Sequence, residues 1–337
     1  MGVAAARARR GRTGARPSAL DDRPIGGQAV LEGVMMRGVR TWSVATRAPT
    51  PEQVERAQRE VPAGEIVVQT TPFASVLRRH RLLRVPLVRG VVALGESLGI
   101  GMRALSVSVA VQTGGDGGEE LPRGTWAGAV ALSLVLAIGL FFVLPVGIVS
   151  LVKRPLHSAT LFWLVEGVVR TAIFLGYLVL ISRLRELRRV LEYHGAEHKA
   201  IACYEAGAPL EPACALRFSR LHPRCGTSFL LIVMIVAIFV FAPLGLPAWY
   251  WLIATRILGV PVIAGLSYEI IRLAARHRAH RWVALIIAPG LALQRLTTRE
   301  PDESQLAVAI AALRAVLDAE EVDDLQASDL VGLEVVA

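Results

Sequence analysis

Side chains that bind transition metals recur within a short stretch of this sequence. His194 and His198 are four residues apart, and His222 and Cys225 follow in a segment that also contains proline and glycine. Residues four apart on a helix face the same side, so His194 and His198 can bind one ion together. Imidazole and thiolate are ligands that zinc prefers. The sequence therefore predicts a site for zinc or a similar divalent transition metal, with these four residues as ligands.

A carboxylate and two cations accompany the predicted ligands. Glu197 immediately precedes His198 and projects from an adjoining helix face, so it is free to act as a base on metal-bound water. Lys199 and Arg224 can stabilise the negative charge that develops when a peptide, amide or phosphoester bond is cleaved. This set predicts a metal-dependent hydrolase with Glu197, Arg224 and Lys199 as catalytic residues.

Other roles for the same residues stay open. If Cys225 binds the metal permanently, four ligands close the site, and zinc becomes the structural element of a scaffold that is not an enzyme. Cys225 can instead act as a nucleophile with His222 as its base. The order His-x-x-Glu-His also occurs in the inverzincin metallopeptidases, but no distant carboxylate ligand is identifiable here, and Glu205 and Glu269 are only candidates.

The composition indicates a membrane protein. Of 337 residues, 53% are hydrophobic and 19% are charged, and the mean hydropathy is +0.50, which is too apolar for a soluble domain of this size. The formal net charge of +9 comes mainly from arginines beside the apolar segments, where they suit anionic lipid headgroups better than nucleic acid. We therefore expect a lipid bilayer with anionic lipids as a partner and no nucleic acid.

The apolar segments predict a mainly α-helical, multi-pass membrane protein with about four transmembrane helices. The predicted spans are residues 126–151, 159–181, 229–244 and 247–271. Residues 282–293 are too short to cross and contain Pro289, which favours a re-entrant or interfacial segment. Residues 183–224 hold eight Lys or Arg, so the positive-inside rule places this loop and both termini in the cytosol.

Three charged residues inside these spans suggest an alternative function. Glu166 and Arg170 are spaced for a salt bridge on one helix face, which would offset part of the free energy lost when charges leave water. Together with Arg256 they can instead line a path for an ion or a polar substrate. The alternative to a hydrolase or a zinc-containing scaffold is therefore a transporter.

The remaining segments divide the chain into four regions. These are a disordered basic tail (1–24), a cytosolic or interfacial N-terminal region (25–122), a membrane domain (123–300) that contains the metal-site loop (183–227), and an amphipathic helix with an acidic tail (301–337).

Within the N-terminal region, we expect one small antiparallel β-pair, formed by residues 42–47 and 65–70. Residues 25–38 are apolar and interrupted by glycines, which favours a buried or interfacial segment. Residues 85–112 have helical apolar spacing and predict an amphipathic helix on the membrane surface.

Five sequence blocks, in order, resemble a known bacterial membrane family. The blocks are residues 26–38, 193–199, 222–229, 267–270 and 289–301. Together they resemble the YqhQ-like family, a family of unknown function that is sometimes labelled a predicted metal-dependent enzyme. The resemblance covers roughly residues 24 to 317 and implies a multi-pass protein of the bacterial inner membrane. It supplies no substrate, and its metal label rests on the same His, Glu and Cys residues.

Overall fold

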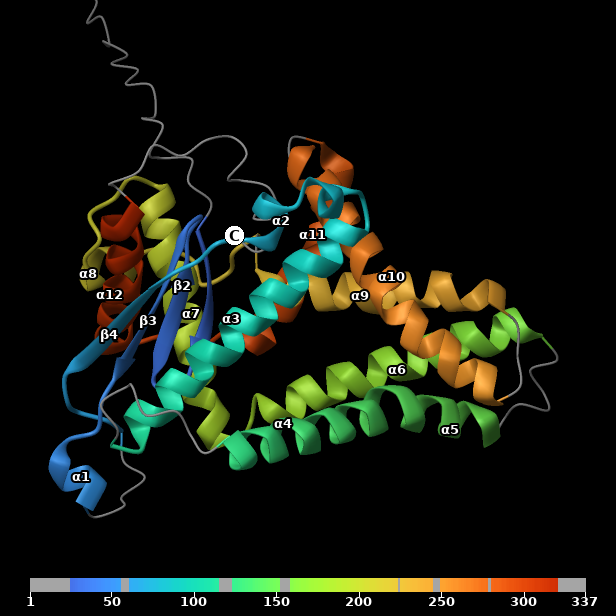
Figure 1. Cartoon of the computed structure of the whole chain (residues 1–337), viewed down its shortest axis with the longest axis horizontal. Helices are drawn as coiled ribbons and strands as arrows, with labels where there is room; N and C mark the ends of the chain where they lie inside the picture. The colour runs from blue at the N-terminus through green and yellow to red at the C-terminus, as the bar shows by residue number, and fades with distance from the viewer. Residues whose placement is uncertain are drawn as a thin grey trace, which may run out of the picture.

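The computed structural model describes residues 25–55, 61–114, 123–151, 158–223, 225–244, 249–277 and 280–320. Within these residues the protein is mainly helical and carries one small antiparallel sheet near the N-terminal end. Figure 1 shows two parts side by side, the sheet with its covering helices and a group of long helices that extend away from it. The predicted basic tail, Arg224 and most of the acidic tail lie outside the described residues.

The sheet is a four-stranded meander in the order β1-β2-β3-β4. Its strands are β1 (Gly26–Val30), β2 (Gly33–Arg37), β3 (Thr41–Arg47) and β4 (Ile66–Pro72). The predicted antiparallel pair is confirmed as β3 with β4. Residues 25–38, however, form a hairpin that doubles the sheet, because a two-residue turn places Val30 opposite Gly33 and Glu32 takes a positive φ of 50°.

The two middle strands of the sheet are buried on both faces, which explains why β2 shows no alternation in the sequence. Every residue of β2 is buried. Val34 and Met36 pack in one cluster with residues of α7 (Arg185–Glu205) and α12 (Glu303–Glu320). Met35 packs on the opposite face with Ile100 and Ala104 of α3 (Val88–Gln112). A strand between two layers of helices needs apolar residues at every position, so the period of two is lost.

The C-terminal helix α12 confirms the predicted helix after Pro301, but it lies in the core rather than on the surface. Leu306, Ile310 and Leu313 are buried in the cluster that α12 shares with α7 and the sheet. At the far end of α12, the buried Glu320 accepts hydrogen bonds from the backbone N–H groups of Arg40 (2.8 Å) and Thr41 (3.1 Å). Helix α12 therefore ends on the β2–β3 turn.

Short helices connect these elements. They are α1 (Pro51–Glu55), α2 (Val76–Arg79), η1 (Arg81–Arg84) and α8 (Pro212–Ala215). The long-helix group consists of α4 (Arg123–Ile138), η2 (Gly139–Val143), α5 (Leu144–Leu151), α6 (Ala159–Ile181), α9 (Gly226–Phe241), η4 (Ala242–Leu244), α10 (Trp249–Arg276) and α11 (Arg281–Thr297). In Figure 1 the continuous helix α4–η2–α5 runs alongside α6, while α3 crosses obliquely from the sheet toward α10.

Three described helices are long and apolar enough to cross a membrane. They are Val88–Gln112, Gly124–Leu151 and Thr160–Ile181. The second and third of these helices coincide with the first two predicted spans, whereas the first is α3, which we expected on the membrane surface. The predicted span 229–244 is covered by α9 and η4, a shorter apolar helix, and residues 249–271 of the last predicted span lie in α10.

The predicted ion pair between Glu166 and Arg170 is present inside α6. The Arg170 guanidinium donates a hydrogen bond to Glu166, and both side chains are buried. Arg170 also lies 5.8 Å from the ring centroids of Phe142 and Phe241, so aromatic faces contribute to its stabilisation. The pair therefore belongs to the packing of α6 against its neighbours.

We expect Arg170→Ala to lower the free energy of unfolding by about 3 kcal/mol, because Glu166 would stay buried without its Arg170 partner. The double variant Glu166→Leu/Arg170→Met should recover much of that loss, since no charge is then buried. Thermal unfolding in detergent measures both. A single variant as stable as the double variant would contradict the structural role.

Candidate metal centre

Helix α7 carries His194, His198 and Glu197. Contacts with a distant part of the chain fix the helix at the turn that bears these residues. A Cβ atom on Gly195 would lie 2.0 Å from the Arg299 carbonyl oxygen, so only glycine allows the chain after α11 to cross here. The Arg299 N–H donates to the Leu191 carbonyl (2.8 Å) at the same crossing. The segment at Arg299, which is distant in the sequence, is thus fixed against the helix turn between His194 and His198.

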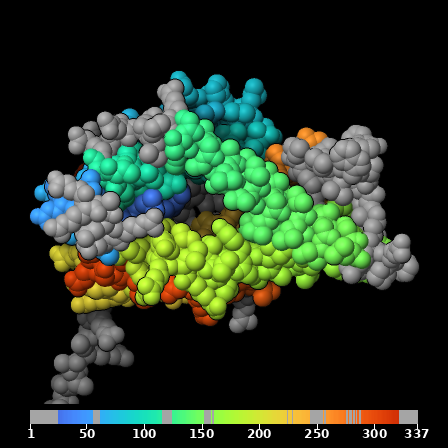
Figure 2. Space-filling model, turned by 90° about the horizontal axis from the view of Figure 1, so that it is seen from below, coloured from blue at the N-terminus to red at the C-terminus, as the bar shows by residue number. Residues whose placement is uncertain are grey.

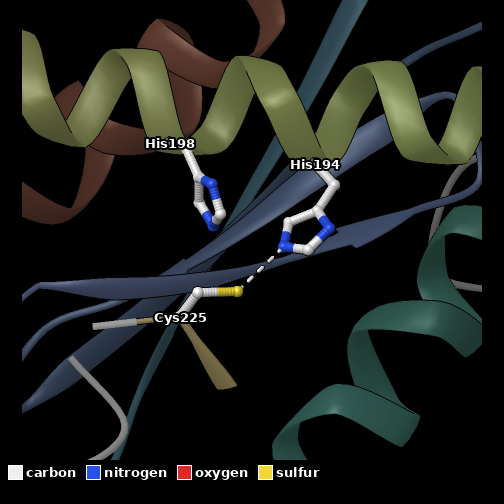
Figure 3. Close-up of side chains that lie close together, drawn as sticks. All are labelled: His194, His198 and Cys225. Atoms are coloured by element: carbon white, nitrogen blue, oxygen red, sulfur yellow. Dashed lines mark hydrogen bonds between the residues drawn. The ribbon is translucent and has the colours of Figure 1, made fainter. Parts of the chain in front are cut away.

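Figure 3 shows that His194, His198 and Cys225 converge. One ligand atom from each of these residues lies within 4.8 Å of the others. The His194 Nε2 atom is 3.3 Å from the Cys225 Sγ atom, and the His194 and His198 ring centroids are 4.5 Å apart. Cys225 is the residue immediately before α9, so the group joins the site helix α7 to an apolar helix. Two imidazoles and one thiol at this separation are a suitable donor set for zinc.

Backbone carbonyls orient both imidazoles toward the group. The Nδ1 atom of His194 lies 2.7 Å from the Thr297 carbonyl oxygen, and that of His198 lies 2.6 Å from the Arg220 carbonyl oxygen. A carbonyl only accepts, so Nδ1 carries the proton in each ring and Nε2 keeps its lone pair. His198 Nε2 is buried and has no hydrogen-bond partner among the described residues. Burial lowers the pKa of His198, which favours the neutral, metal-binding form.

The Glu197 carboxylate is buried, which is unusual for an acidic side chain. Its side chain is 5% exposed and lies under β1, where a Cβ atom on Gly27 would come within 2.9 Å of Glu197 Cγ. Burial raises the pKa of Glu197, while His194, His222 and the Gly27 N–H oppose that shift. The Oε2 atom has no hydrogen-bond partner among the described residues. A buried acceptor of this kind is costly unless something binds it.

His222 lies next to the group of three but outside it. Its ring centroid is 5.9 Å from that of His198, and its Nε2 atom is 3.2 Å from a Glu205 carboxylate oxygen. The Gln294 side chain accepts from the His222 N–H and donates to the His222 carbonyl, both at 2.8 Å. Gln294 therefore fixes this loop from α11. Gln294 is not among the site residues predicted from the sequence, although a glutamine in an apolar helix is a usable signal.

The Lys199 ammonium contacts two backbone carbonyls and one carboxylate. Its Nζ atom donates to the carbonyls of Leu216 and Phe218, both at 2.8 Å, and pairs with Glu300 at 2.9 Å. These contacts join α7 to the loop that precedes His222. Arg220 in that loop also pairs with Glu300, at 3.2 Å. Arg224, the other predicted catalytic cation, lies outside the described residues.

The other candidate carboxylate, Glu269, is occupied elsewhere. It accepts two hydrogen bonds from the Arg89 guanidinium, at 2.7 and 2.5 Å, and so joins α10 to the start of α3. Glu205 is the candidate that approaches the site, through His222.

Comparison with known proteins places the chain among proteins of unknown function. Residues 85–319 match the family described as "Protein of unknown function (DUF1385)", and this protein belongs to that family. Over 313 residues it is 30% identical to the uncharacterized protein YqhQ of Bacillus subtilis (strain 168), covering 89% of this chain and 94% of that relative. No solved structure matches it. The resemblance inferred from the five sequence blocks is confirmed.

We expect Lys199→Met to lower the free energy of unfolding by about 3 kcal/mol, because two partly buried carbonyls would lose their charged donor. Glu300→Gln is the matched control: its side chain is 65% exposed, so the change should lower the free energy by less than about 1 kcal/mol. Denaturant unfolding of the detergent-solubilised protein measures both. A fully stable Lys199→Met variant would argue against this structural tie.

Proposed function

We propose that this protein is a metal-dependent hydrolase that acts at the cytosolic surface of the bacterial cell membrane. The observation that carries the proposal is the buried Glu197 carboxylate with an unpartnered oxygen, which interacts electrostatically with His194, one of three residues whose metal-ligand atoms converge. Three protein ligands leave one position open in a tetrahedral zinc site, and an open position distinguishes a catalytic zinc from a structural one. This arrangement favours a catalytic site over the zinc-containing scaffold.

His194, His198 and Cys225 would hold zinc or a similar ion. When bound, such an ion acidifies water and polarises the bond to be cleaved. Glu197 lies outside the group of three ligand atoms, so we assign it the role of a base that takes a proton from the attacking water. His222, through Glu205 and Gln294, would position the loop that bears Cys225.

The cationic residues have different roles in this proposal. The contacts of Lys199 with two carbonyls and Glu300 favour structural support over direct stabilisation of the reaction. Arg224 remains the candidate for stabilising developing negative charge. Glu166 and Arg170 form a buried ion pair, and Arg170 also lies near the rings of Phe142 and Phe241; this packing does not favour the transporter alternative.

We further propose four membrane crossings with both termini in the cytosol. Support comes from the eight Lys or Arg in residues 183–224 and from the large exposed apolar side chains of α4–α5 and α6. In η1, Leu82 is 87% exposed between Arg81 and Arg84. An exposed leucine flanked by arginines suits the interface of a bilayer that contains anionic lipids.

Elemental analysis of the detergent-purified protein tests the metal site. We expect about one transition-metal ion per chain, lost in His194→Ala/His198→Ala because two of its ligands are removed. The matched control is His277→Ala/His280→Ala, a second pair of neighbouring histidines, with ring centroids 5.8 Å apart. This control should keep its metal. A wild-type protein without metal, even after zinc loading, would exclude both the hydrolase and the scaffold.

Glu197→Gln separates the enzyme from the scaffold. We expect it to keep metal and fold, while hydrolysis falls by about 10²- to 10⁴-fold, because the general base is lost. The assay uses quenched-fluorescent octapeptides of random sequence and, in parallel, vesicles of fluorescent phospholipid. Equal turnover in Glu197→Gln and wild type would contradict the assigned base. A scaffold would instead show no turnover in either protein and would unfold in His194→Ala.

A further inference from the structure

The first strand of the sheet has a free edge beside the candidate metal centre. Among the residues that the structure describes, strand β1 pairs only with β2, and its middle residue, Gln28, is exposed. In an antiparallel pair, successive residues direct their N–H and C=O groups alternately toward and away from the partner strand. Because Val30 and Gly33 close the two-residue turn, Val30, Gln28 and Gly26 face β2. The backbone groups of Gly27 and Ala29 therefore face outward.

The contact with Glu197 supports this assignment of the edge. The Gly27 N–H bonds the Glu197 carboxylate, which is possible only if it points away from β2. No other hydrogen bond from a described residue reaches the outward groups of Gly27 and Ala29. The free edge and the buried carboxylate with its unpartnered Oε2 atom therefore lie side by side.

Helix α7 packs against β1, but the edge residues themselves carry none of the sequence features that block strand pairing. Natural sheets cover or interrupt their edge strands with proline, charges or bulges, because unpaired backbone groups recruit other strands. Residues Gly26–Val30 contain no proline and no charge. At the opposite edge, β4 ends in Pro72. An unprotected edge in a folded protein is suited to binding an extended chain.

The edge is also rigidly joined to the site helix and accessible from outside. At the end of β1, Glu32 accepts two hydrogen bonds of 2.6 Å from Arg189 on α7 and one of 3.3 Å from Tyr193. Figure 2 shows a hollow between the green α4, the teal α3 and the yellow-green α6 and α7, with blue strand residues at its wall.

We propose that an extended polypeptide segment adds to the outward edge of β1 and is the substrate of the candidate site; this inference rests on the proposed function. Backbone hydrogen bonds to the Ala29 N–H and C=O and to the Gly27 carbonyl would hold the segment next to Glu197, which keeps the Gly27 N–H. Its hydrolysis joins a water oxygen to the carbonyl carbon and breaks the C–N bond. Glu197 transfers the water proton to the departing amide nitrogen, which leaves as an amine.

The test measures amide hydrogen exchange of the full chain in lipid nanodiscs, with and without a pool of random-sequence octapeptides. The Ala29 amide should exchange roughly fivefold more slowly with peptide, as one added backbone hydrogen bond implies. The Gln28 amide, already bonded to β2, should not change. A pool methylated on every backbone nitrogen should give no protection, because its methyl groups obstruct strand pairing and it cannot donate to the Gly27 and Ala29 carbonyls.

Two proline variants give the matched comparison. Ala29→Pro removes an outward N–H next to the site, and Val68→Pro makes the same change on β4, whose register with β3 also places that N–H outward. We expect the peptide dissociation constant to rise roughly fivefold for Ala29→Pro only. Unchanged binding by Ala29→Pro, or equal protection by the methylated pool, would overturn the proposal. Protection of the Ala29 amide by phospholipid without peptide would show that the ligand of this edge is a lipid and not a peptide.

Zinc content of the same samples separates the two proposals. Protection of Ala29 by peptide in a protein that binds no zinc would support strand pairing and exclude the hydrolase. Stoichiometric zinc without any protection would leave the metal site standing and exclude the peptide substrate.

Discussion

Hydrogen bonds from α7 to backbone carbonyls of distant segments are the interactions on which the candidate site depends. The rings of His194 and His198 are oriented by the carbonyls of Thr297 and Arg220, and the Lys199 ammonium binds two further carbonyls. Each bond is at least partly buried, where an unmade hydrogen bond costs more than it does in water. One helix face therefore assembles three segments of the chain, and the ligands gain their orientation from the fold.

The same helix joins the long apolar helices to the sheet. Helix α7 follows α6, one of the helices long and apolar enough to span a membrane, after a short turn. On its other side, α7 contacts β1 through Glu197 and the Arg189–Glu32 pair. Cys225 adds a second connection, because it stands at the start of the apolar helix α9. In the function that we propose, the chemistry is therefore placed at the boundary between the apolar helices and the sheet.

Membership in a family of unknown function leaves the argument for function to the site itself. Three ligand atoms with a separate buried carboxylate say more about function than a closed set of four ligands would. The closed set would make zinc a structural element, whereas the open set leaves room for water and substrate. The free edge of β1 adds a second, independent feature, since a backbone edge recognises another backbone with little regard to side-chain sequence.

The sequence by itself determined the local features of this protein. Apolar runs at 126–151 and 159–181 predicted two long helices, and the four-residue spacing of His194 and His198 placed both on one helix face. These features depend on residues near one another in the chain, so periodicity reveals them. The tertiary structure alone decided that β1 and β2 extend the sheet, that Cys225 rather than His222 joins the two histidines, and that Lys199 faces carbonyls. Those outcomes depend on contacts between residues far apart in sequence, such as Gly195 with Arg299 and Gln294 with His222, which no local pattern encodes.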